Sequence, residues 1–338
     1  MHLSQSDRTM SEVVVITGGS AGVGRAVARE FGRRQARVAL IARESERLES
    51  AKREIEEMGG RALALPLDVA DPDEVEQAAA ETERELGPID IWINNAMATI
   101  FAPFAEITAA EFRRVTEVTY LGFVYGTMAA LRRMRQRNRG TIVQVGSALA
   151  YRSIPLQSAY CGAKHGIVGF TDSLRCELIH DHSAIHVTMV HLPAMNTPQF
   201  SWCRTRLPNQ PQPVPPIFEP EVAARAIYWA AHQRRRELYV GFPTSVAIYG
   251  QELAPGFADR HLGRTGYESQ QTGEPVPPNR PDNLFEPVSG NWAAHGVFSS
   301  RAAASSPATW LERHRGAAGT VLAGLGLFAL AAVRFRRS

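Results

Sequence analysis

The stretch VVVITGGSAGVG, residues 13–24, decides the fold of this chain. A short β-branched run ends in a glycine-rich turn, and a helical pattern over residues 22–34 follows at once. Glycines permit a tight turn and let the backbone approach a pyrophosphate, while a helix N-terminus offers free N–H groups and partial positive charge. The sequence therefore predicts a dinucleotide site whose contacts in this turn are Thr17, Gly18, Ser20, Gly22, Val23 and Gly24.

Outward from this turn, short apolar runs alternate with helical patterns as far as residue 240. Such alternation is typical of βαβ units with right-handed crossovers and helices on both faces of a parallel sheet. We predict a Rossmann-type, doubly wound α/β fold. The expected strands span 13–17, 37–42, 62–67, 89–93, 141–145, 185–191 and 238–240, and the expected helices 22–34, 44–58, 71–86, 108–134, 158–179 and 220–232.

The bulk properties are those of a soluble globular protein. The chain has 338 residues, 44% of them hydrophobic, and a formal net charge of +3 with arginines dispersed along it. Dispersed, mild positive charge argues against nucleic-acid binding. Three cysteines without CxxC spacing argue against a disulfide framework or a zinc site. His180, His182, His186 and His191 lack a two-histidine helical spacing, so we expect no metal.

Composition divides the chain into three parts. Residues 1–265 are expected to form a single NADP-binding catalytic domain, and the short polar N-terminus lacks the apolar region of a secretory signal. Residues 266–310 are rich in Pro, Gly, Ser and Asn, which predicts a flexible linker. Residues 311–338 contain an uncharged stretch, 316–333, followed by arginines.

This C-terminal stretch predicts membrane association with the catalytic domain in the cytoplasm. As a helix, its eighteen residues would extend about 27 Å, slightly less than a 30 Å hydrocarbon core. A spanning helix would carry Arg334, Arg336 and Arg337 to the far side, against the positive-inside tendency, so a helix lying in the interface is the other possibility. A loosely packed surface helix or a disordered tail is the non-membrane alternative.

The end of the second expected strand indicates which nucleotide is bound. Ala42 stands where a carboxylate would accept hydrogen bonds from the ribose of NAD, and Arg43, which suits the 2′-phosphate of NADP, follows it. We therefore predict NADP, with NAD the less favoured cofactor. Asp68, Asn94 and Asn95 follow the third and fourth strands and are expected near the adenine and its ribose.

Tyr160 and Lys164 lie four residues apart and share one helix face, while Ser147 follows the fifth strand. Hydride transfer to a carbonyl requires a proton donor, and an ammonium next to a phenol would lower its pKa. Tyr160 is thus predicted as the general acid or base, Ser147 as a hydrogen-bond donor to the substrate oxygen, and Lys164 as the group that also holds the nicotinamide ribose.

Taken together, TGGSAGVG at 17–24, LDV at 67–69, NNA at 94–96, GS at 146–147 and YCGAK at 160–164 resemble the motif series of the short-chain dehydrogenase/reductase family. The resemblance covers residues 12–241. It implies NAD(P), the Ser–Tyr–Lys roles, and pairing into a homodimer or homotetramer through helices 108–134 and 158–179. It also implies cofactor contacts at Val69, Ala96, Pro193 and Thr197.

Two positions depart from the family pattern. Met97 stands where glycine is usual, which would narrow the pocket beside the nicotinamide. Thr119 aligns with the family's helix asparagine, so we expect its hydroxyl to hold a water of the proton relay less well.

The sequence does not identify the substrate. The proline-rich loop 193–220 predicts a lid, and its Phe200, Trp202, Leu207 and Ile217 suggest an apolar pocket. We expect an NADP(H)-dependent oxidoreductase acting on a small carbonyl or alcohol. The alternatives are a non-catalytic NADP-binding sensor or scaffold, and an epimerase or dehydratase that uses bound NAD without net turnover.

Overall fold

The computed structural model describes residues 11–290 and 292–313, and a seven-stranded parallel sheet forms the centre of this part of the chain. The strands run in the order β11-β7-β6-β4-β1-β2-β3, which is the doubly wound Rossmann order. The predicted fold class is therefore confirmed. The strands are β1 (Val13–Thr17), β2 (Arg37–Ala42), β3 (Arg61–Pro66), β4 (Ile91–Asn94), β6 (Thr141–Ser147), β7 (His186–Leu192) and β11 (Glu237–Tyr239).

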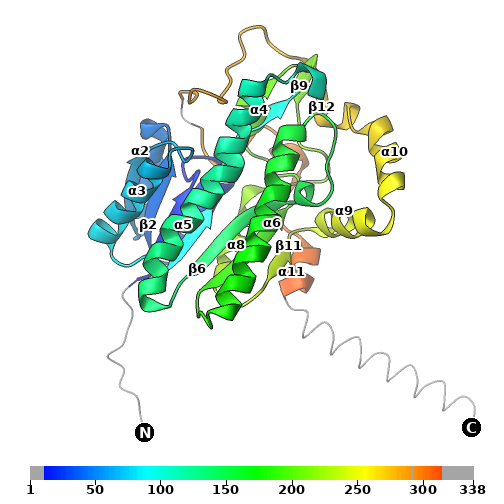
Figure 1. Ribbon diagram of the computed structural model, residues 1–338. Helices are drawn as coiled ribbons and strands as arrows, with labels where there is room; N and C mark the ends of the chain where they lie inside the picture. The colour runs from blue at the N-terminus through cyan, green and yellow to red at the C-terminus, as the bar shows by residue number, and fades with distance from the viewer. Residues whose placement is uncertain (1–10, 291, 314–338) are drawn as a thin grey trace, which may run out of the picture.

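Helices cover both faces of this sheet (Figure 1). Because both faces are covered, the strands are continuous apolar runs, and every residue of β1 is buried. One core lies between the sheet and α1 (Gly22–Gly32), α2 (Ser45–Glu57) and α8 (Pro220–Ala231). The other lies under α3 (Pro72–Leu86), α4 (Ala109–Thr116), α5 (Gly122–Met134) and α6 (Ser158–His180).

Local sequence signals place several helix ends. The Asp71 side chain accepts hydrogen bonds from the Asp73 and Glu74 backbone N–H groups, and Pro72 occupies the first turn, as predicted. Thr108 and Glu111 form a reciprocal capping box that starts α4.

The long helix predicted over 108–134 is interrupted. Between α4 and α5 the chain makes a π-helical turn at Glu117–Leu121, which inserts an extra residue into the helix. Thr119 lies in this turn, and its hydroxyl donates to Ala98 O at 2.8 Å and accepts from Ala98 N at 2.9 Å. The apolar residues keep their helical spacing before and after the π-helical turn, so the hydrophobic pattern alone cannot locate the turn.

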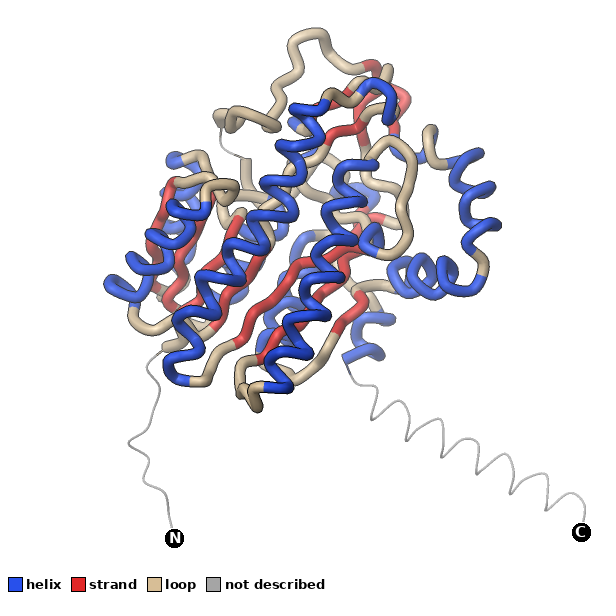
Figure 2. The backbone as a smooth tube through the Cα atoms, viewed as in Figure 1, coloured by secondary structure: helices blue, strands red, loops and turns tan. Residues whose placement is uncertain are grey.

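Past β11 the chain forms two helices that stand at the edge of the sheet, α9 (Phe242–Leu253) and α10 (Pro255–Thr265) (Figures 1 and 2). The short helix α11 (Pro307–Arg313) lies against β11. Three small pairings complete the fold: β5 (Ile100–Phe101) with β8 (Arg204–Thr205), β9 (Asn209–Pro211) with β12 (Gln271–Pro275), and β10 (Ile217–Phe218) with β13 (Ala302–Ala303).

The flexible linker predicted over 266–310 is wrong. β12 and β13 of this segment pair with β9 and β10 of the domain, and the side chains of Leu284 and Ala294 are fully buried. The segment lacks periodicity because its contacts with the domain are made by isolated short strands and single backbone carbonyls, not by a regular element.

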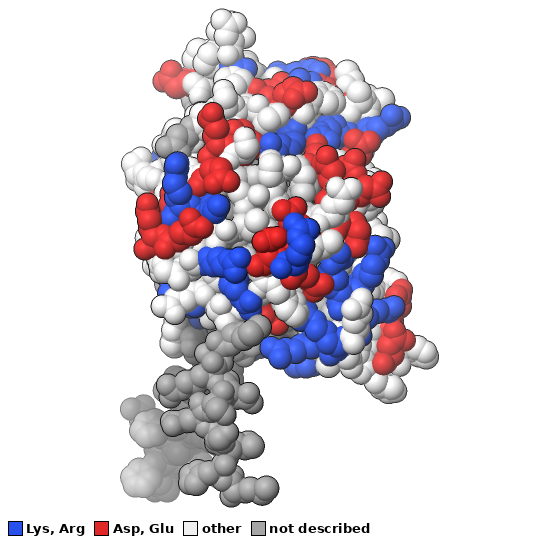
Figure 3. All heavy atoms as spheres, turned by 90° about the vertical axis from the view of Figure 1, so that its left-hand side faces the viewer, with Lys and Arg blue, Asp and Glu red and all other residues white. Residues whose placement is uncertain are grey.

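Among the described residues, no helix has both the length and the apolar character needed to cross a bilayer. The predicted membrane segment 316–333 lies outside the described residues. On the face that carries α2 and α3, basic and acidic side chains are intermingled (Figure 3), so no patch of a single sign forms there.

Candidate active site

The glycine-rich turn after β1 has the backbone geometry that the sequence predicts. Gly18 and Gly22 adopt positive φ angles of 69° and 57°, which side chains rarely tolerate. A Cβ added to Gly24 would lie 2.1 Å from Gly18 O, so α1 can approach β1 this closely only with glycine there. Neither a side-chain cap nor an acidic residue neutralises the N-terminus of α1, which fits an anion such as a dinucleotide phosphate.

Thr17 and Asn95 join the carboxyl ends of β1 and β4. The Thr17 hydroxyl accepts from the N–H groups of Asn95 and Ala96 at 2.9 and 3.0 Å, and the Asn95 amide donates to Thr17 O at 3.0 Å. Asn94, by contrast, points into the core and hydrogen-bonds Thr127 and Gln144. The expectation that Asn94 reaches the adenine is therefore wrong, because strand alternation sends it to the opposite side from Asn95.

A cavity of about 440 Å³ opens at the carboxyl ends of the strands. It brings together residues from the glycine-rich turn, the ends of β2, β3, β4, β6 and β7, and the start of α6. Thr17, Gly24 and Thr119 support its walls without lining it. The predicted site residues that do line it are Gly18, Ser20, Gly22, Val23, Arg43, Asp68, Val69, Asn95, Ala96, Ser147, Tyr160, Lys164, Pro193 and Thr197.

Ser147, Tyr160 and Lys164 meet in the middle of this cavity. Ser147 ends β6, and its side-chain oxygen accepts from Leu149 N at 3.1 Å. Lys164 is buried, and its Nζ donates to Val145 O at 2.8 Å. The same Nζ lies 4.4 Å from the centre of the Phe123 ring and 5.6 Å from that of Tyr160. The lysine is thus fixed between the end of β6 and the ring of the tyrosine.

Burial is the main cause of the pKa shifts of Tyr160 and Lys164. Burial raises the pKa of Tyr160, and a hydrogen bond with Ser147 offsets part of that rise. Burial lowers the pKa of Lys164 to about 7. The predicted lowering of the tyrosine pKa by the ammonium is absent from the protein alone, because the amine is itself desolvated and directed at a backbone carbonyl. Tyr160 is therefore held as a neutral phenol, the form that donates a proton.

Thr119 does not join these three residues. Both hydrogen-bonding functions of its hydroxyl are used by the Ala98 backbone, and its side chain is fully buried. It therefore fixes the π-helical turn against the chain after β4, and the predicted role in holding a relay water does not fit this geometry.

Sequence reasoning missed a second arginine beside Arg43. Arg47 lies one helical turn further on, lines the same cavity and pairs with Glu44 at 3.5 Å. Its Nε is buried without a hydrogen-bond partner among the described residues, and its guanidinium lies 5.1 Å from the Trp202 ring. A partly unpaired guanidinium in this position fits a ligand phosphate.

Residues 283–290 and 292–298, which we call the strap, cross the nucleotide end of the cavity. Asn283 and Pro287 line it. Backbone carbonyls of the strap accept hydrogen bonds from two predicted cofactor-binding residues, Gly22 and Arg43, and from Arg25 and Arg47, which were not predicted. The pairs are Gly22 N with Ala293 O at 3.1 Å, Arg25 with Trp292 O at 3.1 Å, Arg43 with Phe285 O at 2.6 Å and with Asn283 O, and Arg47 with Val288 O.

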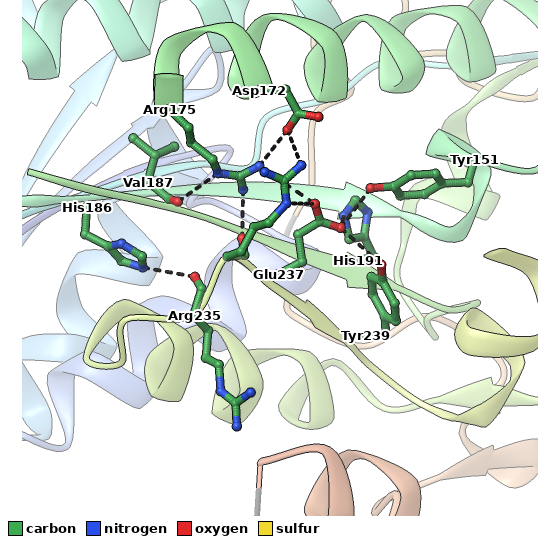
Figure 4. Close-up of polar contacts among 10 residues, drawn as sticks. Tyr151, Asp172, Arg175, His186, Val187, His191, Arg235, Glu237 and Tyr239 are labelled. Atoms are coloured by element: carbon green, nitrogen blue, oxygen red, sulfur yellow. Dashed lines mark hydrogen bonds and ion pairs between the residues drawn. The ribbon is translucent and has the colours of Figure 1, made fainter. Parts of the chain in front are cut away.

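A buried polar cluster is centred on Glu237 of β11 and His191 of β7 (Figure 4). His191 of β7 is fully buried, with Nδ1 3.3 Å from Ser147 O and Nε2 3.3 Å from a carboxylate oxygen of Glu237. Tyr151 and Tyr239 donate to the same carboxylate at 2.8 and 3.2 Å. Although burial opposes it, these donors hold the pKa of Glu237 at about 2. No sequence signal marks this cluster, because its members lie on three separate elements.

The other end of the cavity is apolar. The proline-rich loop is not irregular throughout, since it contains α7 (Gln199–Trp202) and three of the short strands. Phe200 and Trp202 line the cavity as predicted, whereas Leu207 and Ile217 pack into cores. The charged lining residues are Arg43, Glu44, Arg47, Asp68 and Lys164, all of them at the nucleotide end or in the catalytic group.

Residues 12–206 match the family model described as short chain dehydrogenase. The match covers more than half of the chain. It includes the sequence motifs whose residues lie around the cavity. The chain belongs to the short-chain dehydrogenase family, and it is an oxidoreductase acting on CH–OH or C=O groups.

Individual relatives agree with this assignment. The chain is 31% identical to the uncharacterized oxidoreductase YxnA of Bacillus subtilis, over 81% of this chain and 78% of the relative. It is 33% identical to 3-dehydrosphinganine reductase of Danio rerio, over 56% of this chain and 58% of that enzyme. The crystal structure of a metagenomic short-chain oxidoreductase in complex with NADP superposes with a TM-score of 0.58 at 27% identity, covering 68% of this chain and 96% of that one.

Proposed function

We propose that this chain is an NADP(H)-dependent reductase or dehydrogenase in which Tyr160 transfers the proton. The observation that carries the proposal is the meeting of Ser147, Tyr160 and Lys164 in the same cavity as the glycine-rich turn. A non-catalytic sensor has no need of a buried lysine next to a buried tyrosine, since burying an amine costs free energy.

NADP is favoured over NAD by two arginines. Arg43 and Arg47 line the nucleotide end of the cavity, and the end of β2 offers Ala42 in place of a carboxylate. Guanidinium groups bind a phosphate through charge-assisted hydrogen bonds. The similar metagenomic oxidoreductase was solved with NADP, which supports the same choice here.

The residues of this chain perform the acid–base part of the reaction. The nicotinamide cofactor, when bound, supplies or accepts the hydride. Tyr160 gives its hydroxyl proton to the substrate oxygen during reduction and takes a proton from the alcohol during oxidation. Ser147 hydrogen-bonds the same oxygen, and Lys164 is held by Val145 O within reach of the tyrosine ring. Thr197 lies beside Gly22, where it can contact the nicotinamide end of the cofactor.

The substrate is proposed to be uncharged and apolar. The substrate end of the cavity is formed by apolar and amide side chains, without a charged group among its described lining residues. An anionic substrate would lose its hydration there without gaining an ion pair.

Three further assignments belong to this proposal. Residues 1–265 and the strap together form one catalytic unit, paired into a homodimer or homotetramer through α5 and α6. Residues 316–333 hold the protein at a membrane, with the catalytic unit on the cytoplasmic side, where NADPH is available. Eighteen uncharged residues beside a basic end support this placement.

The test is cofactor oxidation by the full chain with a panel of aliphatic, aromatic and anionic carbonyl compounds. We expect NADPH oxidation with apolar ketones or aldehydes and little turnover of anionic ones. Equal use of NADH would contradict the cofactor assignment, and NADPH binding without turnover of any compound would favour the sensor alternative.

A further inference from the structure

Helices α9 and α10 form a hairpin that buries little of its surface in the rest of the protein. In α9 only Thr244 and Ile248 are buried, and α10 has no buried residue. Both helices stand at the β11 edge of the sheet, away from the two helical layers (Figures 1 and 2). A helix that packs so little on its own domain usually has a partner elsewhere.

The outward face of the hairpin is apolar. Phe242, Val246, Tyr249 and Leu253 follow the spacing i, i+4, i+7 and i+11, which places them on one stripe of α9. Phe257, in the first turn of α10, is a further exposed aromatic side chain, and it is counted with the stripe below. These five side chains are 47 to 85% exposed. Removing such side chains from water is favourable, so this stripe is a candidate interface.

Charged groups on the hairpin begin at the exposed Glu252, beside Leu253 of the stripe, and continue along α10. Residues 240–251 carry no charge, whereas α10 has Arg260 and Arg264, both exposed and one helical turn apart. Asp259 of the same helix is paired with Arg152 at 2.7 Å. An apolar stripe next to exposed arginines suits the boundary between acyl chains and anionic headgroups.

The inner face of the same hairpin is a wall of the substrate cavity. Pro243, Thr244 and Ala247 of α9 and Leu262 of α10 line the cavity. The α9–α10 hairpin therefore lies between the apolar end of the cavity and the apolar stripe.

The chain leaves the described structure next to this hairpin. Thr309 of α11 accepts a hydrogen bond from Gly241 N at 2.9 Å, and Gly241 immediately precedes α9. The 25 residues after Arg313, which include the uncharged stretch 316–333, follow α11 in the sequence. Together with the exposed Trp310 and Leu311 of α11, the stripe therefore belongs to the apolar surface on the side of the molecule where α11 joins α9.

We propose that the α9–α10 hairpin docks on the surface of a lipid bilayer, with the stripe at the level of the headgroups and upper acyl chains. Docking in this orientation would place the apolar end of the substrate cavity against the lipid. The hairpin is a contact separate from residues 316–333, and its docking does not depend on the reaction proposed above.

The experiment places an environment-sensitive fluorophore on the stripe of the full chain. Cys161 and Cys203 are buried, so Cys176→Ser removes the exposed thiol, and Leu253→Cys introduces the labelling site. Ile179→Cys, on α6, is the matched control, since Ile179 is 75% and Leu253 85% exposed. With vesicles of phosphatidylcholine and phosphatidylglycerol, we expect a blue shift of the probe at position 253 and none at position 179.

Three results would overturn the proposal. Vesicle binding without a spectral change at position 253 would mean that only residues outside the hairpin reach the lipid. A blue shift without vesicles that grows with dimer formation would assign the stripe to a second copy of the chain. A blue shift without vesicles in a monomeric protein would mean that the chain's own C-terminal residues cover the stripe. As a second measurement, the variant Leu253→Asp/Phe257→Asp should bind the vesicles more weakly than the control variant Phe104→Asp/Ile179→Asp.

Discussion

His191 connects the backbone of Ser147 to the carboxylate of Glu237. Its two ring nitrogens each lie 3.3 Å from an oxygen, one the Ser147 carbonyl and the other a carboxylate of β11. A Cβ on Gly146 would lie 2.5 Å from Nδ1, so the imidazole packs tightly against the strand that carries the serine. Nδ1 lies within hydrogen-bonding distance of the Ser147 carbonyl and Nε2 faces the Glu237 carboxylate, so the imidazole holds the end of β6 beside β11.

Replacing His191 should therefore disturb Ser147 without disturbing cofactor binding. We expect His191→Phe, which keeps a ring of similar size, to lower kcat about tenfold and the free energy of unfolding by about 1–3 kcal/mol. The Kd for NADPH should stay within about twofold. His186→Phe, at the other end of β7 and bonded to Arg235 O, is the control for a purely structural loss. Equal effects on kcat in the two variants would exclude a positioning role for His191.

The second prediction concerns the proton donor. Tyr160→Phe removes one hydroxyl and should lower turnover by about 10²-fold or more, while leaving NADPH affinity nearly unchanged. Tyr228→Phe, on α8 and remote from the cavity, should retain full activity. Steady-state rates and NADPH titrations of both variants test whether Tyr160 is the proton donor. Near-normal turnover of the Tyr160 variant would refute the proposed mechanism.

The third prediction concerns pH and stability. The pKa of Lys164 is about 7 in the folded chain and near 10.5 in the unfolded chain, so burying the charged amine destabilises the fold fully below pH 7. Between pH 7 and 10.5 the unfolded chain binds more protons, and the stability from this group rises with pH. Lys164→Met should therefore stabilise the cofactor-free protein, by an amount on the order of 4 kcal/mol near pH 6 that shrinks toward pH 10.

Lys52 provides the control, because Lys52 and Lys164 are the two lysines of the chain. Lys52→Met removes a side chain that lies 3.8 Å from Glu49 and should leave the melting temperature almost unchanged. Thermal unfolding of both variants and the parent protein across pH 6–10 gives the comparison. A loss of stability in Lys164→Met at pH 6 would show that the amine's contact with Val145 O outweighs its desolvation.

The fourth prediction concerns cofactor choice. Arg43→Asp should raise the Kd for NADPH about 10- to 100-fold, because a charge-assisted hydrogen bond to phosphate is worth about 1.5–3 kcal/mol. The Kd for NADH should change far less. Arg53→Asp, on the exposed side of α2, makes the same charge change outside the cavity. An unchanged ratio of the two affinities would remove Arg43 from the phosphate site.

The fifth prediction concerns the strap. A Cβ on Gly296 would lie 2.5 Å from Thr197 O, so Gly296→Val should prevent the strap from seating beside the cofactor. Both the association and the dissociation of NADPH should become faster, by about tenfold, when this cover is loosened. Gly273→Val, where a Cβ meets open space, is the control. Stopped-flow fluorescence that shows unchanged rates would contradict a covering role.

The sequence was sufficient for the sheet and for the centre of the site. All seven predicted strands are found, because buried parallel strands are continuous apolar runs. Ser147 at the end of β6 and Tyr160 and Lys164 on α6 line the same cavity. The glycine-rich turn was predictable since its positive φ angles require glycine.

The features that escaped prediction depend on contacts between distant residues. Thr119 turns toward Ala98 because of a π-helical turn that leaves the apolar pattern on either side intact. Glu237 lies 46 positions after His191, and β11 brings the two together only in the folded sheet. The strap looks like a linker because isolated carbonyls, which any residue supplies, make its contacts.

The strap is also made late in synthesis. Residue 283 follows Gly22 by about 260 positions, so at roughly 5–20 residues per second it is translated about 13–50 s after the glycine-rich turn. During that interval the donors of Gly22, Arg25, Arg43 and Arg47 lack the carbonyls that later engage them. The nucleotide end of the cavity is therefore open while the sheet is being made, and it is covered only when the last part of the described chain has left the ribosome.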